Sequence, residues 1–364
     1  MNKSNKKKLI CINGESWCRP LTGIERLAIE VTQILDTLVK PNQVELILPQ
    51  NAKNVPELKN IRKVILPVNA GFMPKWTQIH FQKYVIKNKA ISLNFSNTCP
   101  YFVPGIEFIH DIYCKLFKKD FTSRRDKKIV LYSTLMYRRI AKKAKEVITV
   151  SEYTKKTIID SYHIKPEKIS VVYSGLSQEY KNLEPDFSIF EKFPVLKEKP
   201  FYFTLGSLSK RKNLLWILKH AELYPNEFFV VSGKALNNVI PQELEELKNL
   251  KNILLAGYLK DEEVKALYTK AKAFIFPTYF EGFGLPPLEA LSMNCPIIIS
   301  DSTCLPEIYG KCAHYINPND PSINLDEVLK QKTESPKELL EKFTLKNTAE
   351  RLYKIIEKYL RENL

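Results

Sequence analysis

The sequence has little of what marks secreted, metal-binding or membrane-spanning proteins. Its seven cysteines form no C-x-x-C pair and its five histidines are scattered, so neither a disulfide framework nor a zinc site is expected. No apolar run approaches the roughly 18 residues that a membrane span needs. Behind the basic start of the chain stand only the apolar residues Leu9–Ile12, too few for a signal peptide. These absences predict a protein of the reducing cytoplasm.

Acidic residues are in short supply in the first half of the chain. Residues 1–180 hold 31 Lys and Arg against 15 Asp and Glu, whereas the whole chain of 364 residues holds 56 against 40. The formal net charge of +16 therefore arises entirely in the first half. Such an imbalance predicts a negatively charged surface or partner for that half.

One stretch, Phe276–Ala290, joins an apolar run to an aromatic and glycine-containing loop and two prolines. The run Ala273–Phe276 predicts a buried strand. Pro286 and Pro287 predict the first turn of a helix, where a missing N–H is not needed, and Glu289 is expected in that turn. A strand, loop and helix in this order place backbone N–H groups at a sheet's carboxyl edge, where α/β proteins bind phosphate-bearing ligands.

The same stretch carries two glutamates, Glu281 and Glu289, with seven residues between them. It resembles the E-x7-E signature of retaining nucleotide-sugar glycosyltransferases of family GT4, and Ser300–Gly310 resembles the segment that follows in that family. The resemblance runs over nearly the whole chain and is most specific through residues 200–310. It implies the GT-B fold, an α/β class in which two Rossmann-like domains with parallel sheets face across a cleft that holds the active site.

The length and the apolar pattern also favour two α/β domains. An N-terminal, acceptor-side domain is expected over residues 1–182, and the polar, proline-containing segment 183–199 is expected to be a linker. A C-terminal nucleotide-sugar-binding domain is expected over residues 200–345. The resemblance implies that a final helix, residues 346–364, crosses back to the N-terminal domain.

The resemblance assigns roles to the glutamates and to the loop between them. Glu281 would contact the sugar hydroxyls of the donor near the attacked carbon, and Glu289 would hydrogen-bond the donor ribose. A glycosidase acid/base pair is the rival interpretation of two carboxylates. The implied donor-binding residues are Gly23, Arg211, Lys212, Gly282, Phe283, Gly284, Leu285 and Glu289.

Positive charge at the donor diphosphate is the main chemical requirement, because negative charge builds on the leaving group during transfer. Arg211 and Lys212 match the family's donor-phosphate loop, although a solvated basic turn would also explain them. Many relatives carry an arginine directly after the strand glycine, where this chain has Ser207. Either Arg211 or Lys210 would then take its place.

Two features of the first half resemble family motifs more loosely. Gly23, in the loop before an expected helix over Ile24–Val39, resembles the family's first glycine loop, and an ordinary strand-to-helix turn is the alternative. His110 follows an expected strand and resembles the family's histidine that faces the donor sugar and acceptor. A core or capping histidine is the alternative for His110. We interpret His110, with Glu281, as an active-site residue.

A metal is not expected in the transfer reaction. The sequence has no D-x-D triplet of the kind that holds a metal in many other glycosyltransferases, and no cofactor is expected beside the nucleotide sugar itself.

The segment Lys115–Lys145 carries twelve basic residues and two acidic ones. Leu131, Leu135, Met136 and Ile140 are expected to form an apolar face on a helix within it. A basic cluster beside an apolar stripe suits an anionic membrane surface, so peripheral attachment to the inner face of the cell membrane is expected. The alternative is that the stripe packs on the domain and the lysines are solvated.

The signature looks most like that of bacterial polysaccharide and lipopolysaccharide mannosyltransferases. The resemblance therefore implies a retaining, metal-independent enzyme that moves a hexose or deoxyhexose from GDP-mannose or another GDP- or UDP-sugar. The acceptor would be a glycan or a polyprenyl-linked glycan in bacterial surface polysaccharide synthesis. A nucleotide-sugar epimerase on the same fold is one alternative. A basic nucleic-acid-binding protein is another, but the chain has no recognised nucleic-acid motif, so no nucleic acid is expected as a partner.

Overall fold

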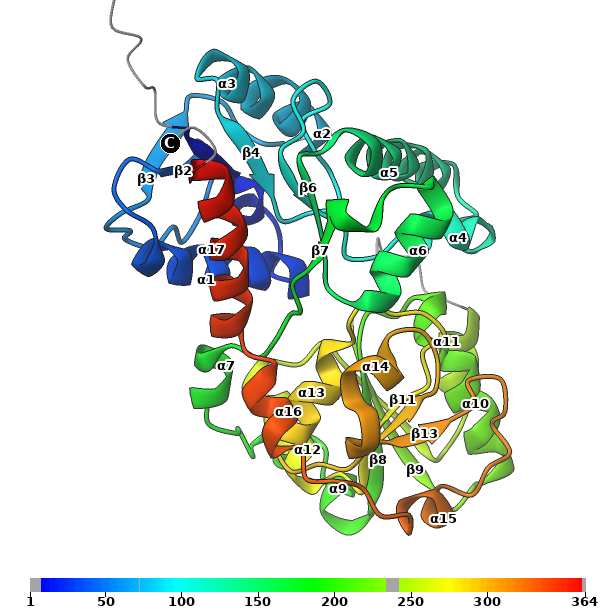
Figure 1. Cartoon of the computed structure of the whole chain (residues 1–364). Coiled ribbons are helices and arrows are strands. Elements are labelled where there is room, and N and C mark those ends of the chain that lie inside the picture. Colours follow the sequence, from blue (N-terminus) through cyan, green and yellow to red (C-terminus); the bar gives the residue numbers. More distant parts are fainter. Residues whose placement is uncertain (1–7, 72, 234–241, 362–364) are drawn as a thin grey trace, which may run out of the picture. The chain divides into compact units, whose positions relative to one another are not determined.

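The computed structural model describes residues 8–71, 73–233 and 242–361, which form two compact units (Figure 1). The first unit comprises the chain up to Ser174 together with Leu345 onward, and the second comprises Gly175–Thr344. Each unit is built around one sheet with helices packed against it.

The sheet of the first unit has seven strands in the order β3-β2-β1-β4-β5-β6-β7, and all of its pairs are parallel. The strands are β1 Ile10–Asn13, β2 Val44–Pro49, β3 Arg62–Leu66, β4 Ile91–Asn94, β5 Ile106–Phe108, β6 Glu146–Thr149 and β7 Ile169–Val171. The central strands are buried along their whole length, as expected for a parallel sheet covered on both faces.

Helices cover both faces of this sheet. The α-helices are α1 Gly23–Leu38, α2 Met73–Lys75, α3 Gln82–Lys87, α4 Tyr113–Leu116, α5 Arg124–Lys143, α6 Glu152–Tyr162 and α17 Leu345–Arg361. Shorter turns are the 3-10 helices Gly14–Cys18, Lys118–Asp120 and Pro166–Lys168 and the π-helix Trp76–Phe81. The last helix, α17, lies beside α1 (Figure 1) and buries Leu352 and Ile356 in the same apolar cluster as Leu27 and Val31.

The sheet of the second unit has six parallel strands in the order β10-β9-β8-β11-β12-β13. The strands are β8 Phe201–Leu205, β9 Phe228–Ser232, β10 Ile253–Gly257, β11 Ala273–Phe276, β12 Ile297–Ser300 and β13 His314–Ile316. The helices are α7 Gln178–Asn182, α8 Ile189–Lys192, α9 Val195–Glu198, α10 Leu214–Leu223, α11 Gln242–Leu247, α12 Asp261–Lys270, α13 Leu285–Ser292, α14 Leu305–Tyr309, α15 Leu325–Leu329 and α16 Lys337–Lys342.

The segment 183–199, expected to be a linker, is folded into the second unit. It contains α8 and α9, and Ile189 of α8 is fully buried. The backbone N–H of Asp186 donates to the carbonyl of Glu262, 2.9 Å away, which ties the segment to α12. Pro194 separates the one-turn helices α8 and α9 within the second unit instead of marking a connection between domains.

The apolar side chains of α5 do not all lie on one face. Met136 and Ile140 are buried in the core beside β6, as the helical spacing predicts. Leu131 and Leu135 are 72% and 47% exposed, so they belong to the solvent side of the helix. The expected four-residue stripe is therefore wrong and splits into a core pair and a surface pair. None of the helices in the described ranges is long and apolar enough to cross a membrane.

Candidate functional site

The strand order of the second unit reverses between β8 and β11, and two loops begin at the carboxyl ends of these strands. Such a switch point is where open α/β sheets bind ligands. The two loops are joined by hydrogen bonds: Tyr279 N–H donates to Arg211 O over 3.1 Å, and the Asn213 amide donates to Pro277 O over 2.9 Å. The site is therefore a fixed junction of two loops that are far apart in the sequence.

A buried carboxylate bridges two cations at this junction. Glu281 Oε1 lies 2.7 Å from Lys212 Nζ, and Glu281 Oε2 lies 3.0 Å from Arg211 Nη1. The side chains of Glu281 and Lys212 are 7% and 11% exposed. Lys210 is exposed and lies outside this cluster. Of the two residues that could replace the arginine missing at Ser207, Arg211 is the one that contacts Glu281. The three side chains carry a net charge of +1.

The cations hold Glu281 in its ionised form. Burial alone would raise the pKa of Glu281, but Arg211 and Lys212 outweigh burial and hold this pKa below its usual value. Lys212 Nζ also lies 4.4 Å from the centre of the Phe276 ring, a cation–π contact that fixes the lysine over the end of β11.

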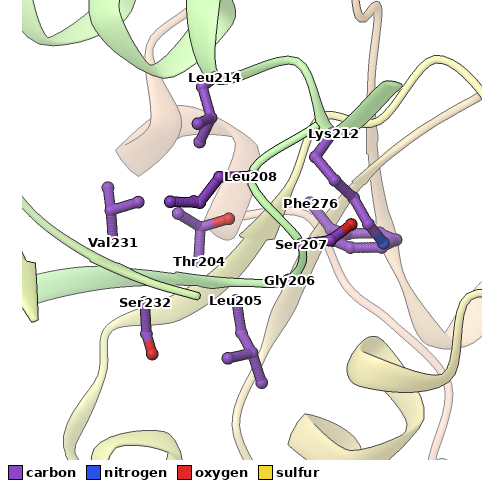
Figure 2. A pocket seen from close by; sticks show the side chains of 10 residues that line it. All are labelled: Thr204, Leu205, Gly206, Ser207, Leu208, Lys212, Leu214, Val231, Ser232 and Phe276. Carbon is purple, nitrogen blue, oxygen red and sulfur yellow. The ribbon is translucent and has the colours of Figure 1, made fainter. Parts of the chain in front are cut away.

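A small pocket opens beside Lys212 at the carboxyl end of β8 (Figure 2). Gly206, Ser207 and Thr204 line it together with apolar side chains such as Leu208 and Val231, and Phe276 lies next to Lys212. A Cβ on Gly206 would lie 3.1 Å from Lys212 Cε, so a larger residue here would displace the lysine. The pocket and the ion cluster thus share one side chain, Lys212.

The glycine that precedes α13 adopts a conformation that few other residues tolerate. Gly284 has φ of 82°, and a Cβ there would lie 2.7 Å from Leu305 Cδ2. The helix begins at Leu285, with Pro286 and Pro287 in its first turn as predicted. Glu289 is the fifth helical residue and lies in the second turn, so its predicted place in the first turn is wrong. The favourable interaction between a carboxylate and the positive end of a helix, which is limited to the first turn, therefore does not explain a glutamate at position 289.

The other predicted residues of this loop offer backbone groups to the site, because their side chains are absent or packed within the unit. Phe283 is buried and packs edge to face on Phe343, with ring centres 5.5 Å apart. Gly282 is buried, whereas Leu285 is half-buried at the first position of α13. Leu285 has a backbone N–H in the first helical turn, where donors are free of the helix's own bonding pattern.

Residues of the segment 300–310 hold the Glu281 loop in place, a role that their sequence alone does not predict. Glu281 N–H donates to Thr303 Oγ1 over 3.2 Å, and Cys304 Sγ donates to Glu281 O over 3.3 Å. The Tyr309 hydroxyl donates to Gly284 O. The resemblance of this segment to its family counterpart was the signal that could have identified them.

His110, in the first unit, is fixed by three backbone contacts. Its Nε2 lies 2.5 Å from Phe95 O, so Nε2 carries the proton and Nδ1 is the acceptor. Its N–H donates to Asn97 Oδ1 over 2.8 Å, and its carbonyl accepts from Thr154 Oγ1 over 3.2 Å. Burial lowers the pKa of His110 and outweighs the Phe95 carbonyl, which would raise it, so the ring is neutral at pH 7.

Gly23 begins α1 in the first unit and is exposed. A Cβ at this position would meet no described atom within 4 Å, so packing within the chain does not require glycine there. Nearby in the sequence, Arg19 Nη1 lies 3.2 Å from Glu25 and 3.6 Å from Glu15, both of which are buried. Nothing in the sequence pattern predicts this ion cluster.

The structure therefore brings Arg211, Lys212 and Glu281 into direct contact, with Gly284 beside them and Glu289 one turn into the adjoining helix. His110 and Gly23 belong to the other unit. Among the residues that the structure describes, no group of three or more His, Cys, Asp or Glu side chains is arranged to hold a metal ion.

Two family models cover most of the chain. The model for glycosyltransferase family 4 matches residues 23–180, and the model for glycosyl transferases group 1 matches residues 186–344. The chain is 26% identical over 277 residues to the O-antigen chain mannosyltransferase RfbU of Salmonella typhimurium, which covers 75% of this chain and 72% of that protein. It is 31% identical over 189 residues to the O-antigen chain mannosyltransferase B of Escherichia coli, covering 49% of each protein.

A solved structure with the same fold is that of HepE from Anabaena in complex with UDP and glucose. It superposes with a TM-score of 0.70 and 14% sequence identity, covering 97% of this chain and 100% of that one. This likeness and the two parallel-sheet units confirm the predicted fold class.

Proposed function

Because the chain belongs to the GT-B glycosyltransferases, with the family 4 and group 1 models matching successive halves, we propose that it transfers a hexose or deoxyhexose from a nucleotide sugar to a glycan acceptor. The observation that carries the proposal is the cluster of Arg211, Lys212 and Glu281 beside a pocket at the β8/β11 switch point. Cations and a carboxylate at such a site suit a ligand with both phosphates and sugar hydroxyls.

The two cations have the chemistry that transfer requires. Breaking the bond from sugar carbon to phosphate oxygen builds negative charge on the leaving nucleoside diphosphate. Arg211 and Lys212 are already held in place, so they stabilise this charge without reorganising. They supply positive charge that a metal supplies in other phosphate sites, and we propose that transfer proceeds without one.

The carboxylates and the histidine take distinct roles in the proposal. Glu281 accepts hydrogen bonds from sugar hydroxyls, and Glu289, on α13, accepts them from the ribose of the donor. Gly23, Gly282, Gly284 and the backbone of Phe283 and Leu285 give the donor close access to the chain. His110 contacts the reacting sugars as a neutral side chain, because its proton is fixed on Nε2.

A mannosyl donor, GDP-mannose, is the specific candidate. The names of the Salmonella and Escherichia relatives support it, since both are O-antigen chain mannosyltransferases. Retention of the anomeric configuration is proposed from the E-x7-E pattern. The acceptor is proposed to be a glycan, or a polyprenyl-linked glycan, in surface polysaccharide synthesis.

Attachment to the inner membrane surface is a separate part of the proposal. On α5, the exposed Leu131 and Leu135 lie one turn apart, and exposed basic residues extend along the same helix. Apolar side chains flanked by lysine and arginine suit an interface with anionic lipid, where each basic residue contributes about 1 kcal/mol.

The test of the function is a thermal-shift screen of the full chain with nucleotide sugars, followed by transfer assays. A donor at 100 times its Kd should stabilise the folded chain by about 2.7 kcal/mol. GDP-mannose is expected to give the largest shift in Tm, and Lys212→Ala to abolish it. Transfer should persist in EDTA. Absence of a shift with every GDP- and UDP-sugar would contradict the donor site, and loss of transfer in EDTA that Mg2+ restores would contradict metal independence.

A further inference from the structure

Glu281 uses both of its oxygens on the two cations of the donor site. Lys212 takes Oε1 at 2.7 Å and Arg211 takes Oε2 at 3.0 Å. The same lysine lines the neighbouring pocket (Figure 2), between Phe276 and Ser207. A diphosphate that entered this pocket would have to share Lys212 with a carboxylate of its own charge sign.

The backbone of the loop has anchors besides this carboxylate. Its backbone is anchored separately, because Glu281 N–H donates to Thr303 and Glu281 O accepts from Cys304. The Thr278 hydroxyl lies 2.6 Å from Arg211 O, which joins the two loops, and 3.1 Å from Glu281 Oε1. The charge of Glu281 is therefore separable from the position of Glu281.

We propose that the Glu281 carboxylate weakens the hold of the site on the nucleoside diphosphate product and so promotes its release. This rests on the proposed function. With donor bound, the carboxylate faces sugar hydroxyls as well as the cations. Once the sugar has left, the Glu281 carboxylate pairs only with Lys212 and Arg211, and its negative charge repels the remaining diphosphate. Removing the charge raises the net charge of the cluster from +1 to +2 and should retain the diphosphate.

The test is Glu281→Gln, which keeps the size of the side chain and one acceptor oxygen, removes the charge and replaces the other oxygen by an amide NH2 group. Calorimetric titration of the full chain with GDP and with UDP should show affinity about tenfold higher than wild type, because one elementary charge a few ångströms away has an effect of this order. Dissociation followed by stopped flow should slow in proportion. The gain should shrink as salt rises, since screening weakens the interaction.

A control variant is Glu191→Gln, which removes one exposed carboxylate of α8 and should leave nucleotide affinity unchanged. Glu281→Ala gives a second test and carries the same direction of change, should the glutamine variant not fold. Equal or weaker binding by the folded Glu281 variants, with wild type binding normally, would overturn this inference alone. Failure of wild type to bind either nucleotide would overturn the proposed function together with it.

Discussion

Lys210 and Lys212 stand two residues apart in the loop after β8, yet their surroundings differ. Lys212 packs against Glu281 and Phe276 with its side chain 11% exposed, whereas Lys210 is exposed. Lys212→Ala should lower kcat about 100-fold or more, the usual loss when one fixed donor to a developing charge is removed. Lys210→Ala should stay within a factor of two. Steady-state kinetics with saturating acceptor distinguishes them, and equal losses would contradict a specific role for Lys212.

Glu107 on β5 predicts a pH dependence of stability. Burial raises the pKa of this fully buried carboxyl to about 8, despite hydrogen bonds from Ser92, Asn94 and Gly105 that lower it. The folded state therefore binds a proton that the unfolded chain, with an ordinary pKa near 4.5, has lost. Its contribution to stability is complete below pH 4.5 and declines as pH rises to about 8, by up to about 1.4 kcal/mol per unit.

Glu107→Gln should remove this slope, because a neutral amide takes the place of the protonated carboxyl. The measurement is urea denaturation of wild type and variant at several pH values between 5 and 8. The two curves of unfolding free energy should converge toward pH 5 and separate toward pH 8. Parallel curves would show that Glu107 is ionised in the folded protein.

For individual side chains, the sequence predicts which residues belong to the candidate site but not their contacts or their burial. Glu281, Arg211 and Lys212 were identified as site residues because family motifs contain them. Their direct contact was not predicted, since it depends on two loops that meet only in the folded sheet. Glu45, Glu107 and Glu146 lie on strands, where charged residues usually indicate an exposed face, yet each is buried among hydrogen-bond partners.

Substitutions at two glycines distinguish a glycine that the fold requires from one that ligand binding requires. Gly284→Ala should cost about 1–2 kcal/mol, because φ is 82° and the new Cβ would press on Leu305. Gly23→Ala should change stability by less than about 0.5 kcal/mol, because its Cβ meets open space among the described residues. Denaturation and transfer assays on both variants check this. If Gly23 gives the donor close access, its variant loses activity without losing stability.

Helix α5 tests the membrane proposal at the level of one element. A variant with Arg138, Lys142 and Lys143 changed to Glu should no longer pellet with anionic vesicles at low salt, while wild type should. Arg139 is left unchanged because its Nε donates to Tyr101 O, a contact that holds the chain together. Pelleting of both proteins alike would place any membrane site elsewhere.

A matched control carries the same change of charge on other exposed lysines: Lys53, Lys346 and Lys354 to Glu. It should pellet like wild type. Changing Leu131 and Leu135 to Asn should weaken binding to neutral and anionic vesicles alike, because it removes apolar contact without changing charge.

Element prediction was most accurate where the pattern and the packing agree. The helix expected over Ile24–Val39 is α1, and the strand expected over Ala273–Phe276 is β11, because each buries a continuous apolar face. The predictions of elements were wrong where one residue type is compatible with two different structures. Pro194 of the segment 183–199 separates two short helices of a folded segment, and Leu131 and Leu135 are apolar but lie on the solvent side of α5.

At the scale of the whole molecule, the first unit depends on a helix from the far end of the sequence. Ile356 of α17 is fully buried in the core that contains β1 and α1. Ile356→Ala should destabilise the first unit by about 2–5 kcal/mol, and Lys354→Ala, on the exposed side, should not. Hydrogen exchange should show lower protection in β1 and β4 and unchanged protection in β8 and β11. Uniform loss in both sheets would contradict separate units.

The division of the first unit also sets an order of events during synthesis. The second unit is continuous from Gly175 to Thr344, so all of its strands exist before α17 does. The first unit has its seven strands by residue 171 but gains the closing helix only from Leu345 onward. At about 5–20 residues per second, roughly 10–35 s pass between these points. The first unit is therefore synthesised first but completed last. Until α17 has been made, the apolar face of α1 is uncovered, and we expect chaperones to shield it during translation.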